Sequence, residues 1–349
     1  MNRSDWQNQF PEVPERIHQS IVNTLEGLEE RDGKRMKDIS NHKKKGRRIM
    51  VILAAAMVAA IGTTALAAEI FKWNDRAKEV FVADEEAQNE LVAQGNVTGI
   101  GRKVSDQGVS VELIQSIQDS HYFYALFEVS SEDGSMTLDE DNQLAMDVTY
   151  GNQESPFTML EWGFVSNSEQ EPGSSRYFEI SGTKDGGTAA GSLKMNIVFS
   201  ALQKEQGKAE KGDDIVNGSW PFELDVKQTD FQLFAPEMTC SLGGYEVKVT
   251  SVELSPLSVT ITCDAEDIRR MEEGEGISID QNDLPAPMVI SGIRYQDGTA
   301  VPQEYRVTGF GYSGEGGAFT ITQRFSSVVD VEKTEAVLMG NGQDEIRIR

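Results

Sequence analysis

The longest hydrophobic run of the chain covers residues 49–68 and contains no charged residue. A helix of this length, at about 1.5 Å per residue, spans roughly 30 Å, which is the thickness of the hydrocarbon core of a bilayer. A buried helix of a water-soluble domain is rarely this long without a charge. The run therefore predicts a transmembrane helix over residues 49–68.

The pattern before this run predicts a short amphipathic helix over residues 14–29. Its apolar residues recur at helical steps on one face: Ile17, Ile21, Val22, Leu25 and Leu28. Residues 31–48 are nearly all polar, so no neighbouring helix can cover this stripe. We expect the stripe to bind a partner protein. The alternative is contact with the inner membrane surface, which fits less well because the face lacks Phe and Trp.

A second helix is expected directly after the hydrophobic run, over residues 74–96. Asn74 or Asp75 can cap its N-terminus, Val80 and Leu91 recur at helical steps, and Gly95 can end it. This juxtamembrane helix is expected to form a stalk or to dock on the domain that follows.

From Val97 onward the spacing of apolar residues changes to the alternation that is typical of β-strands. The polar, glycine-containing segment 203–219 interrupts this pattern, so we expect two β-rich modules, over residues 97–205 and 220–349. The predicted fold class is membrane-anchored and mainly β. It comprises a short N-terminal helix, one transmembrane helix, a stalk helix and two β-sandwich-like extracellular modules.

A faint repeat supports two modules. The stretch GVSVEL from Gly108 and the stretch GYEVKV from Gly244 each precede a second strand at a similar point of each half. Aligning the two blocks requires one gap. Chance similarity between amphipathic strands explains the match almost as well as duplication does.

The charge distribution orients the chain across a membrane. Five basic residues stand immediately before the hydrophobic run: Lys43, Lys44, Lys45, Arg47 and Arg48. Basic residues next to a span tend to stay in the cytoplasm, so we expect a single-pass protein of the cell membrane. Its N-terminus would be cytoplasmic and its C-terminal domain extracellular. A cleaved signal peptide is the alternative, because residues 65–67 read Ala-Leu-Ala, but 48 residues precede the run and the run is too long.

The acidic composition limits the partners of the outer part. Residues 1–48 hold 11 Lys or Arg and 8 Asp or Glu, so residues 69–349 hold 32 − 11 = 21 basic and 57 − 8 = 49 acidic residues. An outer charge of −28 would repel phosphates, so we expect no nucleic acid as a partner. The membrane itself and a cell-wall ligand remain compatible with the sequence.

Candidate chemistry is sparse. The three histidines are His18, His42 and His121; no Gly-x-Ser-x-Gly motif and no His/Cys cluster accompanies them. The acidic runs 139–142 and 272–275 lack the alternating spacing of a calcium loop. We therefore expect no enzyme, no catalytic residue, no metal and no cofactor. We interpret His121 as a histidine at a strand edge without a catalytic role.

Two further features leave alternatives open. Cys240 and Cys263 can form a disulfide outside a cell, or serve as small buried hydrophobic residues. The aromatic cluster around Glu161 and Trp162, which includes Phe157 and Phe164, can line a carbohydrate site but is more often sandwich core.

The order of these features resembles a known family. The segment PEVPERIHQSIVNTL, the KKKGRR run before an apolar anchor and the outer stretch GVSVELIQSIQDSHYFYALFEV together resemble single-pass anti-sigma-factor-like membrane proteins of Gram-positive bacteria. These proteins have an uncharacterised β-rich extracellular domain. The stretch YEVKVTSVELSPLSVTITCDAED resembles the immunoglobulin-like C-terminal module that often follows that domain.

The resemblance implies a function in transcription regulation. The inner helix would sequester an extracytoplasmic-function sigma factor, and the outer β modules would sense the envelope. One departure is that residues 1–48 contain no cysteine, whereas many anti-sigma factors carry a zinc-binding His-x3-Cys-x2-Cys element. The competing hypothesis is a surface-anchored wall-binding or adhesion β protein without a regulatory role, and a third is an exported hydrolase.

Overall fold

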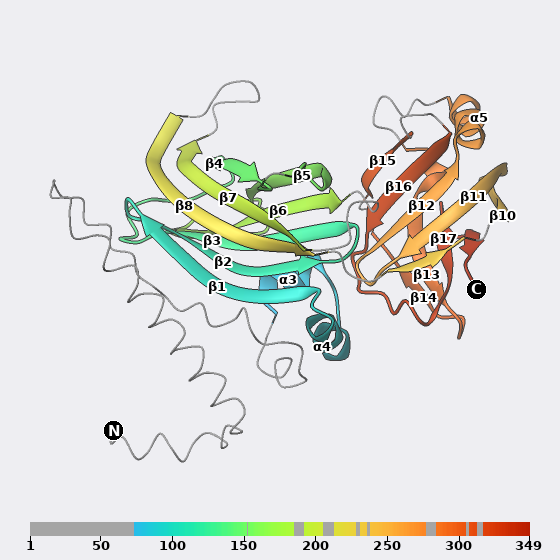
Figure 1. Cartoon of the computed structure of the whole chain (residues 1–349), viewed down its shortest axis with the longest axis horizontal. Coiled ribbons are helices and arrows are strands. Elements are labelled where there is room, and N and C mark those ends of the chain that lie inside the picture. Colours follow the sequence, from blue (N-terminus) through green and yellow to red (C-terminus); the bar gives the residue numbers. More distant parts are fainter. Residues whose placement is uncertain are drawn as a thin grey trace, which may run out of the picture. The chain divides into compact units, whose positions relative to one another are not determined.

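A computed structural model describes residues 73–151, 153–184, 192–204, 213–227, 231–235, 238–276, 284–304, 307–312 and 317–349 (Figure 1). In these ranges the chain is mainly β, with several antiparallel sheets and few helices. The expected amphipathic helix 14–29, the basic run 43–48 and the expected span 49–68 lie outside the described residues. No helix within the described ranges is long and apolar enough to span a membrane.

Two short helices replace the single helix that was expected over residues 74–96. They are α3 (Asp75–Val80) and α4 (Glu85–Ala93). Asn74 caps α3 by accepting a hydrogen bond from the backbone of Arg76, and Asp84 caps α4. Between them the backbone is extended at Phe81, and Val82 forms a parallel bridge with Ser327. The helix is interrupted because a distant segment of the chain binds its backbone there.

The first module consists of two antiparallel sheets. Its strands are β1 (Val97–Asp106), β2 (Val109–Gln118), β3 (Tyr122–Ser131), β4 (Asn142–Thr149), β5 (Phe157–Phe164), β6 (Ser175–Lys184), β7 (Ser192–Lys204) and β8 (Asp213–Lys227). One sheet has the order β1-β2-β3-β6-β5 and the other β4-β7-β8. Side chains of both sheets form one core, in which the rings of Phe127 and Phe199 meet edge to face at 5.4 Å.

The outer face of the five-stranded sheet is covered by the two helices. Trp73, Phe81 and Leu91 pack there against Tyr122 and Tyr124 of β3, and all five are buried. This cover explains why β3 is buried on both faces along most of its length rather than on alternate residues.

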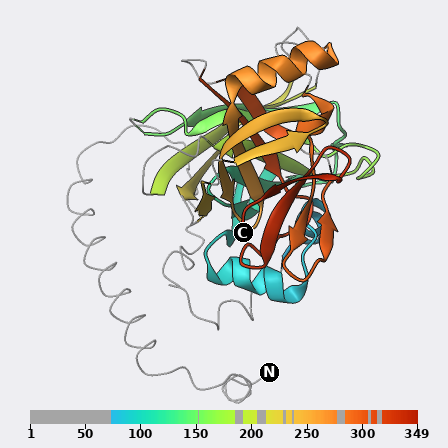
Figure 2. The same cartoon turned by 90° about the vertical axis from the view of Figure 1, so that its right-hand side faces the viewer.

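The second module is built in the same way. Its elements are β9 (Gln232–Phe234), β10 (Met238–Leu242), β11 (Tyr245–Leu254), β12 (Ser258–Asp264), α5 (Ala265–Glu275), η2 (Ala286–Met288), β13 (Ile290–Tyr295), β14 (Ala300–Pro302), β15 (Val307–Tyr312), β16 (Ala318–Arg324), β17 (Thr334–Met339) and β18 (Asp344–Arg347). The sheets have the orders β10-β11-β12-β16-β15, with β9 also paired to β11, and β14-β13-β17-β18. The helix α5 packs on their shared core through Ile268 and Met271 (Figure 2).

The expected boundary between the modules is wrong. The strand β8 pairs with β7, and Trp220, Phe222 and Leu224 of β8 are buried in the first core. The first module therefore extends to Lys227, and the second begins near Gln232. The polar stretch 203–219 contains the connection between two paired strands, and local polarity alone does not distinguish such a hairpin from a linker between domains.

The two modules share one topology. The order β1-β2-β3-β6-β5 corresponds to β10-β11-β12-β16-β15, and β4-β7-β8 corresponds to β13-β17-β18. The turns before β2 and β11 both hold two residues with positive φ, 53° and 79° at Gln107 and Gly108 and 59° and 87° at Gly243 and Gly244. Both strands then shift register after their fifth residue. The faint sequence repeat is thus a structural repeat, and β2 and β11 align without a gap.

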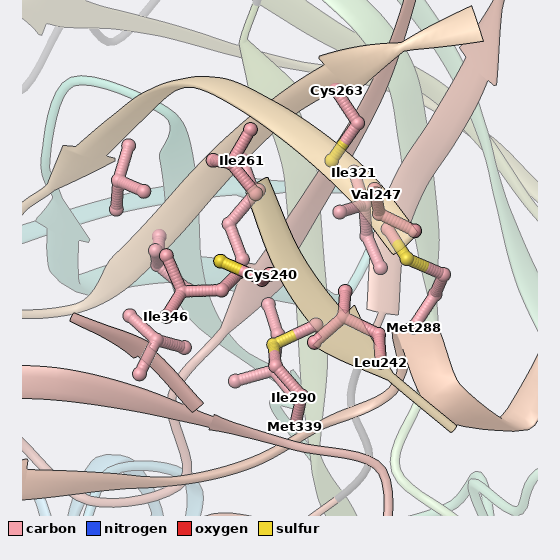
Figure 3. Close-up of a cluster of buried hydrophobic side chains, with 14 of the residues drawn as sticks. Cys240, Leu242, Val247, Ile261, Cys263, Met288, Ile290, Ile321, Met339 and Ile346 are labelled. Atoms are coloured by element: carbon pink, nitrogen blue, oxygen red, sulfur yellow. The ribbon is translucent and has the colours of Figure 1, made fainter. Parts of the chain in front are cut away.

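Both cysteines are buried, free thiols in the second core (Figure 3). Cys240 lies on β10 and Cys263 on β12, and β11 separates these strands. Two strand spacings amount to about 10 Å, whereas a disulfide needs Cα atoms about 4.4–6.8 Å apart. Burial is the main cause that raises the pKa of Cys240 to about 11 and that of Cys263 to about 12. Of the two alternatives for these residues, the structure has the free thiols.

Candidate functional site at the junction of the two modules

Two equivalent turns of the repeat meet at the junction of the modules. The β2–β3 turn of the first module contains Asp119, and the β11–β12 turn of the second contains Ser255. The Oδ2 atom of Asp119 accepts hydrogen bonds from the hydroxyl groups of Ser255, at 2.5 Å, and Ser258, at 2.7 Å. Its Oδ1 atom accepts from the backbone N–H groups of His121 and Tyr122. The carboxylate is fully buried, and these four donors replace the water that it loses on folding.

A histidine hydrogen-bonded to a glutamate lies beside this carboxylate. Nε2 of His121 is 2.6 Å from Oε2 of Glu253 in the second module, and only 1% of His121 is exposed. The imidazole ring also meets the ring of Phe231 edge to face at 5.4 Å. Its Nδ1 atom is buried and has no hydrogen-bond partner among the described residues. The contact is therefore a hydrogen bond between imidazole and carboxylate that joins the two modules.

The segment between α3 and α4 contacts both modules at the same place. The backbone of Val82 donates to Ser326 and accepts from Val328, each at 2.9 Å, and Arg324 donates to the carbonyl of Val80 at 2.8 Å. These three partners belong to the second module. On the other side, the ring of Phe81 packs edge to face against two tyrosines of the first module, at 5.6 and 6.1 Å. The guanidinium of Arg324 also lies 5.0 Å from the Phe81 ring.

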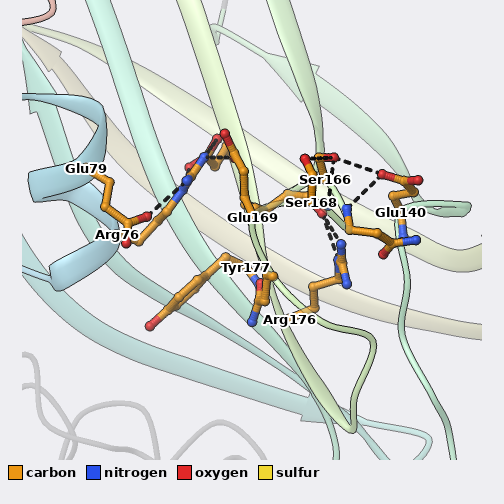
Figure 4. Close-up of polar contacts among 12 residues, drawn as sticks. Arg76, Glu79, Glu140, Ser166, Ser168, Glu169, Arg176 and Tyr177 are labelled. Carbon is orange, nitrogen blue, oxygen red and sulfur yellow. Dashed lines mark hydrogen bonds and ion pairs between the residues drawn. The ribbon is translucent and has the colours of Figure 1, made fainter.

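A network of charged side chains fixes α3 to the first module (Figure 4). The guanidinium of Arg76 donates to Glu179 of β6 at 2.7 Å and pairs with Glu169 at 2.8 Å and Glu79 at 3.1 Å. Tyr124 donates its hydroxyl to the same Glu179 at 2.7 Å. Burial alone would lower the pKa of Arg76, but its bonds to Glu179 raise it overall. Burial, reinforced by Glu179, raises the pKa of Tyr124 well above its usual value.

A buried lysine completes the junction. Lys184 ends β6, and its backbone N–H donates to the carbonyl of His121 at 2.7 Å. Its ammonium group donates to the carbonyl of Lys227 at 2.8 Å. Burial outweighs the attraction of nearby Asp119 and lowers the pKa of Lys184 to about 8. The junction therefore brings together the Asp119 carboxylate, the His121 imidazole and the buried Lys184 side chain.

These contacts suit the junction for mechanical coupling. Ser255 and Ser258 of the second module donate to Asp119 of the first, and Glu253 of the second module bonds to His121 of the first. No group of three His, Cys, Asp or Glu residues that could hold a metal ion is present in the described part of the chain. The described contacts tie the two modules and the segment 80–82 together at one place.

Little of this junction could be predicted from the sequence. His121 was interpreted as a histidine at a strand edge without a catalytic role; it is buried and paired with Glu253. Asp119, Arg324 and Glu253 were not singled out, because a polar residue in a turn resembles an ordinary solvated one. The repeat was the one available signal, since it places residues 119–121 and 255–257 at equivalent turns.

The other predicted site residues lie elsewhere. The expected partner-binding stripe (Ile17, Ile21, Val22, Leu25 and Leu28) and the basic run (Lys43, Lys44, Lys45, Arg47 and Arg48) fall outside the described residues. In the aromatic cluster, Phe157 and Phe164 pack against the first core, whereas Trp162 is 52% exposed.

Comparison with known proteins identifies no family. No protein-family model matches the chain, and no curated protein matches it. One similar solved structure is a conserved domain protein from Bacillus anthracis, with a TM-score of 0.44 and 12% identity over 70% of this chain and 76% of that chain. Another is the C-terminal domain of the Streptococcus agalactiae AgI/II polypeptide BspA, with a TM-score of 0.14 and 11% identity over 62% of this chain and 81% of that chain. Both TM-scores are below 0.5, so neither likeness carries an argument about function.

Proposed function

We propose that the chain is a single-pass membrane regulator that resembles an anti-sigma factor. Residues 1–48 would lie in the cytoplasm and bind an extracytoplasmic-function sigma factor through the apolar stripe at Ile17, Ile21, Val22, Leu25 and Leu28. Residues 49–68 would cross the membrane, and the two β modules would lie outside the cell, where they sense the envelope.

The observation that carries this proposal is the attachment of the segment just after the expected span. Trp73 follows that span closely in the sequence and is buried against the first module. The segment 80–82 is hydrogen-bonded to the second module, and Phe81 packs on the first. A ligand that changes the contact between the modules would therefore displace residues that lead directly into the membrane.

A passive anchor does not need this arrangement. A surface protein that only binds the wall can be held by a flexible polar linker between its span and its outer domain. Here the fully buried carboxylate of Asp119, the pair of His121 and Glu253, and the buried ring of Phe81 all depend on the same junction. Separating the modules would take the hydroxyl groups of Ser255 and Ser258 from Asp119 and would separate His121 from Glu253, so these contacts favour the joined state.

The test uses the full-length chain in its native host and in neutral detergent. Purification of the tagged chain is expected to enrich a sigma factor, and Ile21→Asp with Leu25→Asp is expected to abolish that enrichment. The matched control is Arg16→Ala on the polar face of the same expected helix, which should leave it unchanged. Deletion of residues 10–30 is expected to raise transcription of the genes that depend on this sigma factor.

The opposite result identifies the competing function. If no sigma factor is enriched, and deletion of residues 10–30 changes no transcript, the regulatory proposal is wrong. Binding of the outer part to purified wall polymer in the same preparations would then favour a wall-binding or adhesion protein.

A further inference from the structure

The first module is closed along one side and open along the other. On the closed side, β8 reaches β1 and β2: the backbone of Ser219 donates to Asp106 at 2.9 Å, and the indole of Trp220 donates to the carbonyl of Val109 at 3.0 Å. On the open side, β4 and β5 each end their sheet and lie beside each other (Figure 1). Within the described ranges, these two strands are not paired to each other, and β5 has β6 as its one strand partner.

The open side, which we call the β4–β5 seam, exposes hydrophobic surface. Met146 and Val148 of β4 and Leu160 of β5 pack against the core but are only partly buried. Trp162 and Met159 of β5 are 52% and 42% exposed. Trp162 stands opposite Ile180 on the core side of the sheet, and Met159 stands opposite Thr183 on the other side. The two exposed side chains therefore flank the free edge of β5 on both faces.

This edge lacks the usual protection against further pairing. Natural edge strands are shortened, interrupted by proline, or lined with lysine. The edge strand β1 carries Arg102 and Lys103, and β14 is three residues long and ends at Pro302. In contrast, β5 is eight residues long, its one register shift lies at its start between Phe157 and Met159, and Glu161 is its one charged residue. A strand added along β5 would satisfy the open backbone groups of the edge and cover the hydrophobic surface.

The charged residues around the β4–β5 seam indicate which kind of peptide could add to β5 as a strand. Residues 104–175 contain no Lys or Arg and fourteen Asp or Glu. Exposed carboxylates stand along the seam at Asp147 on β4, Glu154 in the connection and Glu161 on β5. A second copy of this chain would bring like charges together there, whereas a polypeptide rich in Lys or Arg would be attracted.

We propose that the β4–β5 seam binds an extended cationic peptide segment of another protein, which adds as a strand to β5. Alternate side chains of the peptide lie over Trp162 on one face of the sheet and over Met159 on the other. Its Lys or Arg residues face Asp147, Glu154 and Glu161. The second module contacts this region through β15, where the hydroxyl of Thr183 donates to the carbonyl of Thr308 at 2.7 Å. The proposal does not depend on residues 1–48, so it holds or fails separately from the sigma-factor proposal.

The experiment measures binding of defined peptides to the full-length chain in neutral detergent. The probe is a fluorescently labelled ten-residue peptide in which Lys alternates with Val and Thr. Its anisotropy is expected to show saturable binding at 0.05 M salt that weakens at least fivefold at about 0.5 M salt. Amide hydrogen exchange is expected to slow in residues 157–164 when the peptide is bound. A peptide of similar charge with Pro at alternate positions should not bind, because it cannot pair with a strand.

Matched variants locate the site. Trp162→Ala is expected to weaken binding at least tenfold, and Met159→Ala several-fold, without loss of the fold because both side chains are largely exposed. Glu161→Gln should weaken binding and reduce its dependence on salt. The control is Leu233→Ala on β9, which removes an equally exposed hydrophobic side chain (60% exposed) of the second module and should change binding less than twofold.

Several results would overturn the proposal. A peptide with Glu in place of Lys that binds as tightly would exclude the electrostatic argument, and unchanged exchange in residues 157–164 would exclude strand addition. Equal losses from Trp162→Ala and Leu233→Ala would place binding elsewhere. If Trp162→Ala instead abolishes self-association or wall-polymer binding while no cationic peptide binds, the seam serves a different partner and the proposal is wrong.

Discussion

Replacement of Asp119 by alanine tests whether the junction is as strongly coupled as its contacts indicate. The substitution removes a fully buried carboxylate that accepts four hydrogen bonds. The hydroxyl of Ser255 has a second acceptor, the carbonyl of Ser258 at 3.2 Å, so it can remain bonded. The backbone N–H groups of His121 and Tyr122 lose the acceptor that Asp119 supplies.

The expected magnitude follows from these two amides. A buried donor left without a partner costs about 1–3 kcal/mol, so Asp119→Ala should lower the free energy of unfolding by about 2–6 kcal/mol. The matched control is Asp297→Ala. Asp297 accepts a hydrogen bond from the backbone N–H of Thr299 at 2.8 Å in a similar turn, but it is exposed. In the alanine variant, water can bond to this N–H group, so the free energy of unfolding should fall by no more than about 1 kcal/mol.

Urea unfolding of the full-length chain in detergent, followed by tryptophan fluorescence, measures both variants. If Asp119→Ala costs no more than Asp297→Ala, the junction is not held by this carboxylate, and the argument for coupling through it fails. Asp119→Asn is a further check: the amide oxygen can still accept from the two backbone groups, so this variant should lose less than the alanine variant does.

Three further predictions concern other parts of the fold. Burial lowers the pKa of Lys184 from 10.5 to about 8. Between pH 8 and 10.5, Lys184 is therefore mostly protonated in the unfolded chain and mostly neutral in the folded chain. Stability should therefore rise as pH increases from about 8 to about 10.5, and Lys184→Met should remove this rise in pH-dependent urea unfolding. Burial raises the pKa values of Cys240 and Cys263, so both thiols should resist a soluble thiol reagent at pH 8 and react only after unfolding. Rapid labelling of the native chain would contradict their burial. Gly243→Ala should cost more stability than Gly244→Ala. Both residues have positive φ, but only at Gly243 would the new Cβ clash with the ring of Pro287. Equal melting temperatures for the two variants would refute this prediction.

The strands of both modules could be predicted because their pattern is set locally. In β2, for example, Val109, Val111 and Leu113 alternate because one face of the strand meets the core. The same alternation predicted that both modules are mainly β. It missed α5, although Asp264 caps this helix and Gly276 ends it in the left-handed conformation.

The errors come from contacts between residues that are distant in the sequence. The interruption between α3 and α4 depends on Ser327, which the local pattern of residues 74–96 cannot show. The boundary error has a similar cause, because β8 is assigned to the first module by its pairing with β7 and not by any feature of residues 205–219. The junction was missed for the same reason: Asp119 finds its hydroxyl partners in another module.

The structural repeat places complementary side chains at the junction. The two turns that meet there are equivalent in topology, yet their side chains differ in a complementary way: the first repeat supplies Asp119 and His121, and the second supplies Ser255 and Glu253. Each repeat alone would leave these polar groups without their partners in the other repeat. Two modules that acted independently would have no reason to keep such complementary partners buried. The two modules therefore form one structural unit. The segment 80–82, which leads back to residue 73, is bound at the junction between them.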